Sequence, residues 1–148
     1  RDLFFPAGHC PGVALGGYLL QGGFGWNGRV HGPACMSVEA IDVVTAAGEL
    51  VRADADNHPD LFWAARGSGP GFFGAVTRFH LRLYSRPRHV ANAVYLYPLE
   101  LLEEVFTWLG EVGPRVAREV ELMAIVHHDF EGELEIAVTA PALVYSPE

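Results

Sequence analysis

One candidate for chemistry is a thiol at the head of a glycine-rich run. Cys10 stands between His9 and Pro11, and residues 8–26 contain seven glycines. A cysteine reacts through its thiolate, so a functional thiol must be reachable from solvent or stabilised by nearby charge. Glycines leave the backbone bare, which lets a large ligand approach it closely. The pattern indicates a ligand-binding segment beside a thiol, whereas composition by itself favours a buried structural cysteine.

A thiol-dependent enzyme is a second interpretation of the same residues. In that case His9 would activate Cys10 as a base. Neighbouring side chains on an extended chain point in opposite directions, however. The sequence also offers no third group to orient His9, so this interpretation has less support than ligand binding.

A second glycine pattern lies in GSGPGFFG, residues 67–74. It contains a formal GxGxxG at Gly69, Gly71 and Gly74. A dinucleotide-binding fingerprint requires a strand before the glycines and a helix after them. Here a short helix is expected before the pattern and a strand after it. We therefore predict a glycine turn that packs near a ligand or another stretch of backbone, and not a Rossmann site.

Histidines and cysteines are not spaced as metal ligands. His127 and His128 are adjacent in an expected strand, so their side chains point to opposite faces and do not converge on one ion. Cys10 and Cys35 form neither a disulfide framework nor a metal-binding motif. We predict no metal site and two buried free thiols, with a disulfide between them as the alternative.

Composition limits the class of protein. The chain has 148 residues, 50% of them hydrophobic, and a net charge of −8. The acidic balance argues against nucleic acid as a partner, because that needs a clustered basic face. No stretch approaches the ~20 apolar residues of a membrane span. All ten cations are arginine, which suggests a GC-rich bacterial genome. The chain starts without Met or a signal-peptide pattern; we expect a fragment and favour the cytoplasm.

The first part of the chain predicts a β-hairpin followed by a short helix. Residues 12–25 suggest tight turns and short extended pieces, and residues 38–54 a hairpin around Gly48. Asp60 is the expected N-cap of a helix over Leu61–Arg66. A strand is expected over residues 75–87.

A proline-containing polar stretch at Pro87 predicts a boundary. Beyond it, the apolar pattern predicts a β-α-β-β unit with antiparallel pairing. The expected elements are a strand over 90–98, a helix over 99–113 and strands over 118–128 and 133–145. The whole chain is therefore expected to be α+β.

Several ordered segments resemble one known family. They read GHCPGVALGGYLLQGGFG, RVHGPACMSVEAIDVVTAAGELVRAD and NHPDLFWAARGSGPGFFGAVTRFHLRL, followed by the RP boundary. Together they resemble the second half of the FAD-binding domain of the vanillyl-alcohol oxidase / p-cresol methylhydroxylase (PCMH) superfamily, most closely its berberine-bridge-enzyme-like branch. The resemblance implies that residues 1–87 are the C-terminal part of a PCMH-type FAD-binding domain. Residues 88–148 resemble the start of an antiparallel-sheet α+β substrate domain.

The resemblance implies FAD as the cofactor and names its contacts. Cys10 matches the cysteine that forms a thioether to the flavin C6 position, so covalent attachment is implied. Tyr18 replaces a frequent histidine, which is expected to alter polar contacts near cofactor or substrate. The cofactor-binding residues implied are Cys10, Val13, Gly16, Gly17, Gly22, Gly23, Gly25 and Val76, the last through its backbone to the adenine.

The resemblance also implies an activity for the intact protein. A hydride would leave a C–H bond of a small alcohol, sugar or amine for the flavin, and O2 would reoxidise the flavin. No catalytic base is assigned; Tyr95, Tyr97 and Tyr145 are poor candidates because the family base typically lies further along the chain. The alternative is a non-catalytic structural fragment that needs the N-terminal FAD loop, a second copy or the remainder of the enzyme.

Overall fold

The computed structural model describes residues 2–145, which form two compact units. Unit 1 spans Arg1–Arg86 and unit 2 spans Pro87–Glu148, and each is described by itself. All three sheets are antiparallel, and helices and strands follow one another without parallel crossovers. The α+β class is thus confirmed. No helix among the described residues is long and apolar enough to cross a membrane.

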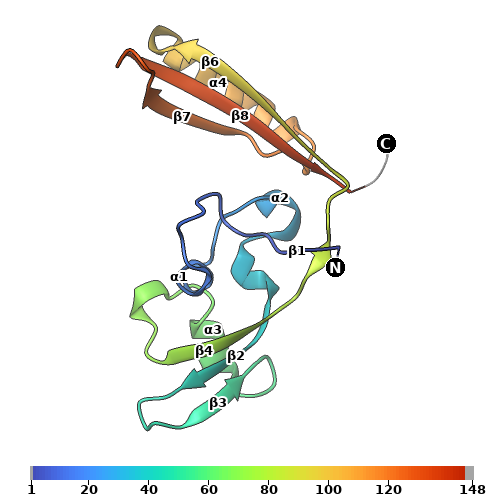
Figure 1. Cartoon of the computed structure of the whole chain (residues 1–148), viewed down its shortest axis with the longest axis vertical. Coiled ribbons are helices and arrows are strands. Elements are labelled where there is room, and N and C mark those ends of the chain that lie inside the picture. Colours follow the sequence, from blue (N-terminus) through green and yellow to red (C-terminus); the bar gives the residue numbers. More distant parts are fainter. Residues whose placement is uncertain (1, 146–148) are drawn as a thin grey trace. The chain divides into compact units, whose positions relative to one another are not determined.

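Unit 1 is built on a three-stranded sheet of order β3-β2-β4 (Figure 1). The strands are β2 (Val38–Val44), β3 (Leu50–Ala53) and β4 (Ala75–Leu81). Strands β2 and β3 form the predicted hairpin, in which the Thr45 carbonyl accepts the Gly48 amide. Gly48 has φ +79°, a conformation that glycine adopts without steric cost. The expected strand over 75–87 is divided into β4 and the short β5 (Tyr84–Ser85), which pairs with β1 (Leu3–Phe4).

Helix α3 (Pro59–Ala64) begins earlier than the sequence suggested. Its N-cap position is His58, not Asp60, so the predicted cap is wrong. Proline is well suited to the first helical position because its φ is already fixed near the helical value and it has no amide to leave unpaired. Asp60 instead lies in the first turn, where its charge complements the helix dipole.

Helix α1 (Leu15–Leu20) was not predicted. The sequence LGGYLL suggested turns, because glycine costs about 1 kcal/mol relative to alanine in a helix. Leu19 is completely buried in the core of unit 1. Packing of its leucine face therefore outweighs the poor helix propensity of Gly16 and Gly17. The remaining helical segments before the sheet are α2 (Gly28–His31) and the 3-10 turn η1 (Ala34–Ser37).

The glycine pattern of residues 67–74 forms a 3-10 turn, η2 (Gly69–Gly71), that leads into β4. A helix and then a strand flank it, so the exclusion of a Rossmann fingerprint is confirmed. The turn packs against the chain itself. A Cβ at Gly74 would lie 2.6 Å from the Val43 side chain, and one at Gly69 would lie 2.9 Å from Gln21.

Unit 2 has the predicted β-α-β-β order with antiparallel pairing. Its last strand lies in the centre, giving the order β6-β8-β7 (Figure 1). Val105 of the helix packs against Ile136 and Val138 of the central strand. The strand expected over 118–128 is regular only from Met123. The elements are β6 (His89–Pro98), η3 (Leu99–Leu101), α4 (Leu102–Val112), η4 (Gly113–Arg115), β7 (Met123–His128) and β8 (Leu134–Val144).

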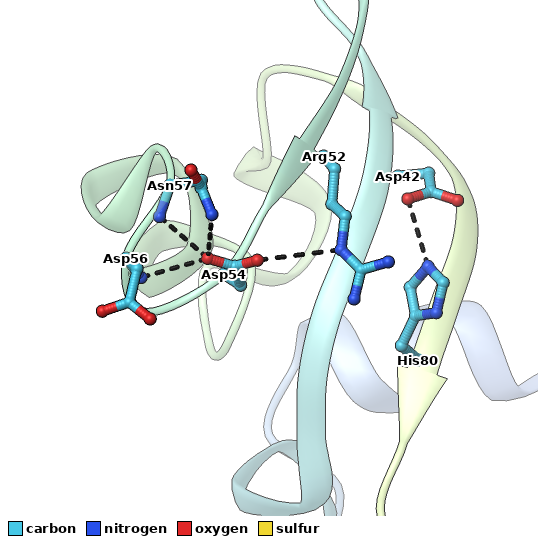
Figure 2. A network of polar contacts seen from close by, with 6 residues as sticks. All are labelled: Asp42, Arg52, Asp54, Asp56, Asn57 and His80. Carbon is cyan, nitrogen blue, oxygen red and sulfur yellow. Dashed lines mark hydrogen bonds and ion pairs between the residues drawn. The ribbon is translucent and has the colours of Figure 1, made fainter.

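A carboxylate organises the loop between β3 and α3 (Figure 2). Oδ1 of Asp54 accepts the backbone amides of Asp56 and Asn57 at 3.0 and 2.8 Å, and the Asn57 side-chain amide at 2.9 Å. Arg52 Nε lies 3.7 Å from the other oxygen. The hydrogen bonds from Asn57, with that from the Asp56 amide, lower the pKa of Asp54.

The core assignment predicts a large cost for truncating Leu19. Leu19→Ala should lower the free energy of unfolding by about 2–5 kcal/mol, because it leaves a cavity beneath α1. Leu50→Ala is the matched control, since Leu50 is 66% exposed; its cost should stay within about 0.5 kcal/mol. Urea unfolding followed by circular dichroism measures both. Equal costs would contradict the placement of α1 on the core.

The Asp54 loop predicts a pH-dependent contribution to stability. Because the folded-state pKa is lowered, the stabilisation is present above the unfolded-state pKa and is lost as the pH falls through the folded-state pKa. Asp54→Ala should lower the thermal midpoint at neutral pH, and its difference from wild type should shrink on acidification. Asp56→Ala, which removes an exposed carboxylate but keeps the amide donor, should change little at either pH. A pH-independent difference for Asp54→Ala would contradict this assignment.

Candidate functional site: a glycine-lined groove beside Cys10

A groove of about 450 Å³ runs along α1 and the turn that follows it. Three of the residues that the sequence assigned to cofactor binding line it, namely Val13, Gly17 and Gly23. The full lining consists of Val13, Ala14, Gly17, Tyr18, Gln21, Gly23 and Phe24. Val13 and Phe24 are exposed by 58% and 79%, so the rim offers apolar surface to a ligand.

Tyr18 fixes the wall of this groove. Its hydroxyl donates a hydrogen bond to the Pro6 carbonyl at 3.0 Å. A Cβ placed on Gly23 would lie 2.7 Å from its ring. Gly23 also has φ +77°, so both space and backbone conformation require glycine there. The Tyr18 hydroxyl thus bonds within the protein, on the segment that precedes Cys10. No pattern in the sequence predicts this hydrogen bond.

The predicted cofactor glycines divide into two kinds. A Cβ on Gly25 would overlap the Ala7 carbonyl oxygen and the Tyr18 hydroxyl. Gly25, like Gly23, is therefore glycine because of contacts inside the protein. Gly17 and Gly22 have no heavy atom within 4 Å of such a Cβ, and Gly16 meets only the Phe79 ring at 3.9 Å. Their bare backbone leaves room for a flat ligand, although the φ of +101° at Gly22 favours glycine there in any case.

Cys10 lies at the start of this segment and is exposed. Its carbonyl accepts the Val13 amide at 3.3 Å, closing a turn that leads into the groove. The prediction that both thiols are free is confirmed, but burial is wrong for Cys10. The exposure of Cys10 makes its thiol accessible to a ligand. The His9 ring packs on Trp26, with centroids 4.6 Å apart.

Cys35 is the buried thiol. Burial raises its pKa, and the nearby charge of Arg66 opposes that shift. A thiol held protonated in the core is inert, as expected of a packing residue.

Val76 lies away from the lining of the groove. It pairs with Val43 across β4 and β2, and its side chain packs against the core of unit 1. The backbone contact of Val76 with the adenine, which the resemblance implied, stays a prediction.

The paired histidines of unit 2 make local contacts. His127 Nδ1 lies 2.9 Å from the His128 carbonyl, and His127 Nε2 lies 3.5 Å from Glu135. His128 Nδ1 lies 2.9 Å from the Gly132 carbonyl. Across residues 2–145, no group of three potential ligands is placed to hold a metal ion.

These residues fit a flavin cofactor. The groove offers bare backbone at Gly17, apolar rim side chains and an exposed thiol a few residues away. A flat, largely apolar ring needs such a surface, because backbone can approach its face only where no Cβ intervenes. Val13 and Gly17 line the groove that would hold it, and Cys10, Gly16 and Gly22 are near these residues in the sequence but outside the lining.

The two kinds of glycine predict opposite results for alanine substitution. Gly25→Ala should destabilise unit 1 by at least about 1–3 kcal/mol, because the added methyl collides with the Ala7 backbone. Gly17→Ala should leave stability unchanged or raise it by up to about 1 kcal/mol, since it lies in a helix facing open space. Urea unfolding compares them. Similar losses for both variants would contradict this division.

Comparisons with known proteins agree with this fit. The family model described as an FAD binding domain matches residues 1–54. The FAD-linked oxidoreductase janO of the fungus Penicillium janthinellum is 47% identical over 121 residues, which are 82% of this chain and 27% of that protein. Since this relative is fungal, the bacterial origin expected from arginine usage stays a prediction.

Solved structures show the same fold. Physcomitrella patens BBE-like 1 superposes with a TM-score of 0.84 at 27% identity, covering 96% of this chain and 30% of that one. The 6-hydroxy-D-nicotine oxidase of Arthrobacter nicotinovorans gives 0.83 at 28% identity, covering 96% and 32%. This chain thus spans about a third or less of each. It belongs to the vanillyl-alcohol oxidase / p-cresol methylhydroxylase family of FAD-binding proteins, in the berberine-bridge-enzyme-like branch, and FAD is its cofactor.

Proposed function

We propose that the intact protein is an FAD-linked oxidase that removes a hydride from a C–H bond of a small alcohol, sugar or amine. The observation that carries the proposal is the groove with open backbone at Gly17, beside the exposed thiol of Cys10. Bound FAD supplies the electron acceptor, and O2 is the proposed final oxidant. Similarity to oxidoreductases that include an oxidase supports this class of reaction.

The residues of this chain bind and orient the cofactor in this proposal. Gly16, Gly17 and Gly22 allow the backbone to contact the ring, and Val13 covers its edge. Tyr18 holds that wall in place through Pro6. Unit 1 is accordingly assigned to the FAD-binding domain and unit 2 to the start of the substrate domain. The catalytic base is assigned to neither unit.

Cys10 is the proposed site of covalent attachment. Its exposure leaves the sulfur accessible to a ring bound in the groove. The C–S bond would form with loss of the thiol S–H and one ring C–H, and O2 would take up the two electrons and two protons as H2O2. Cys35 lacks this access, because it is a buried residue of η1.

A structural role is the second candidate, and exposed apolar residues on edge strand β6 favour it. Val90, Val94 and Leu96 are exposed by 68%, 54% and 59%. An apolar edge strand is a template for pairing with another strand. This chain would then act only with a second copy or with the remainder of the protein. Light scattering with and without the remainder distinguishes this case, because a monomer that binds FAD unaided contradicts it.

Covalent attachment predicts that flavin stays with acid-precipitated protein. In the intact protein, the yellow colour should remain in the pellet. Cys10→Ser should release the flavin. If another residue of the intact protein also attaches the flavin covalently, Cys10→Ser should instead change the absorption spectrum. Cys35→Ala, the matched thiol control, should keep both colour and spectrum. The absorption spectrum of the redissolved pellet is the measurement.

The outcomes separate attachment from function. Flavin released from the wild type, or an unchanged spectrum in Cys10→Ser, contradicts attachment through Cys10 and leaves FAD binding intact. A wild-type protein that contains no flavin before acid is added contradicts the proposed oxidase function.

A further inference from the structure

Unit 1 has a second depression that shares no residue with the groove along α1. Its volume is about 570 Å³. It lies between η1, α3 and the glycine turn that precedes β4. Its lining consists of Met36, Trp63, Ala64, Arg66, Gly67, Ser68 and Phe73.

Large apolar side chains surround this depression and remain open to solvent. Trp63 is 75% exposed, Phe73 68% and Met36 58%. Isolated apolar residues on a surface need no explanation, but a group of them around one cavity is typical of a binding site. Aromatic faces and a thioether are suited to stacking on a planar apolar ligand.

The only cation of the lining is Arg66, and it lacks a protein anion. Its guanidinium carbon lies 4.3 Å from the centroid of the Phe62 ring. Its Nε is buried and has no hydrogen-bond partner. Within residues 2–145, no carboxylate forms an ion pair with it, whereas Arg52, Arg78 and Arg82 each have one.

Among the described residues, the guanidinium of Arg66 is a positive charge without a carboxylate partner, in a chain of net charge −8. Arginine carries five donors in a planar fork that matches the two oxygens of a carboxylate or phosphate. The cation–π contact with the Phe62 ring holds the guanidinium beside the cavity before any ligand arrives. The cation and the apolar walls together match one kind of molecule.

We propose that this cavity binds a small ligand that carries an oxyanion, a carboxylate or a phosphate, on a planar apolar body. Arg66 binds the oxyanion, and Trp63 and Phe73 contact the apolar body. The site is separate from the proposed flavin groove, so it stands whether or not Cys10 is an attachment point.

Three matched probes test the site: 2-naphthoate, 2-naphthyl phosphate and the neutral 2-naphthamide. Calorimetric titration should show at least about tenfold tighter binding of an anionic probe than of the amide, as expected for a hydrogen bond to a charged group. The better of the two anions identifies the oxyanion. Arg66→Gln should abolish the preference, and Trp63→Ala should weaken all three probes. Arg82→Gln, an exposed arginine paired with Glu39 outside the cavity, should keep the preference.

Several results would overturn the proposal. They are equal affinity for anion and amide, an unchanged preference in Arg66→Gln, and the absence of binding. The titration is repeated on the intact protein. Binding to this chain but not to the intact protein would mean that the rest of the protein covers the cavity, and it would also overturn the proposal. If Arg66→Gln fails to fold, the NMR resonance of the Trp63 indole N–H in the wild-type protein provides the test. It should shift at a lower concentration of 2-naphthoate than of the amide, and equal titrations count against the site.

Discussion

The close contact between Gly25 and the backbone of Ala7 is the constraint on which the groove along α1 depends. A larger residue at position 25 would separate the two segments. The Trp26 amide donates to the same Ala7 carbonyl, and the Gly22 and Gly23 carbonyls accept the amides of η1. The turn after α1 is thereby fixed from both sides. Its remaining surface forms the groove, which is held rigid before any cofactor binds, as binding sites of high precision require.

Much of the fold follows from local sequence. The β2–β3 hairpin was predictable because β-branched runs flank a turn containing Gly48, and the β-α-β-β order of unit 2 followed from its apolar pattern. Helix α1 could not be predicted in the same way. In LGGYLL, local propensity and tertiary packing oppose each other, and burial of Leu19 decides the outcome. The start of α3 was misplaced because both Pro59 and Asp60 are good early-helix residues.

The candidate site was only partly accessible to sequence reasoning. A run of glycines signals close approach but does not reveal what approaches. The structure shows that Gly25 meets the protein itself while Gly17 meets open space. Composition favoured a buried Cys10, yet its turn places the thiol outside. No pattern in the sequence indicated the cavity that Trp63 and Arg66 line. Its residues come from separate segments, and only the packing of these segments decides which side chains remain exposed.

The central position of β8 has a consequence for synthesis. Strands β6 and β7 pair with β8 and not with each other, yet β8 is the last of the three to leave the ribosome. Until it emerges, the ten residues of β6 have no partner in unit 2. Long-range pairing of this kind slows folding and leaves apolar strands open to aggregation. In the nascent chain, β6 is thus the strand of this sheet that waits longest for its partner.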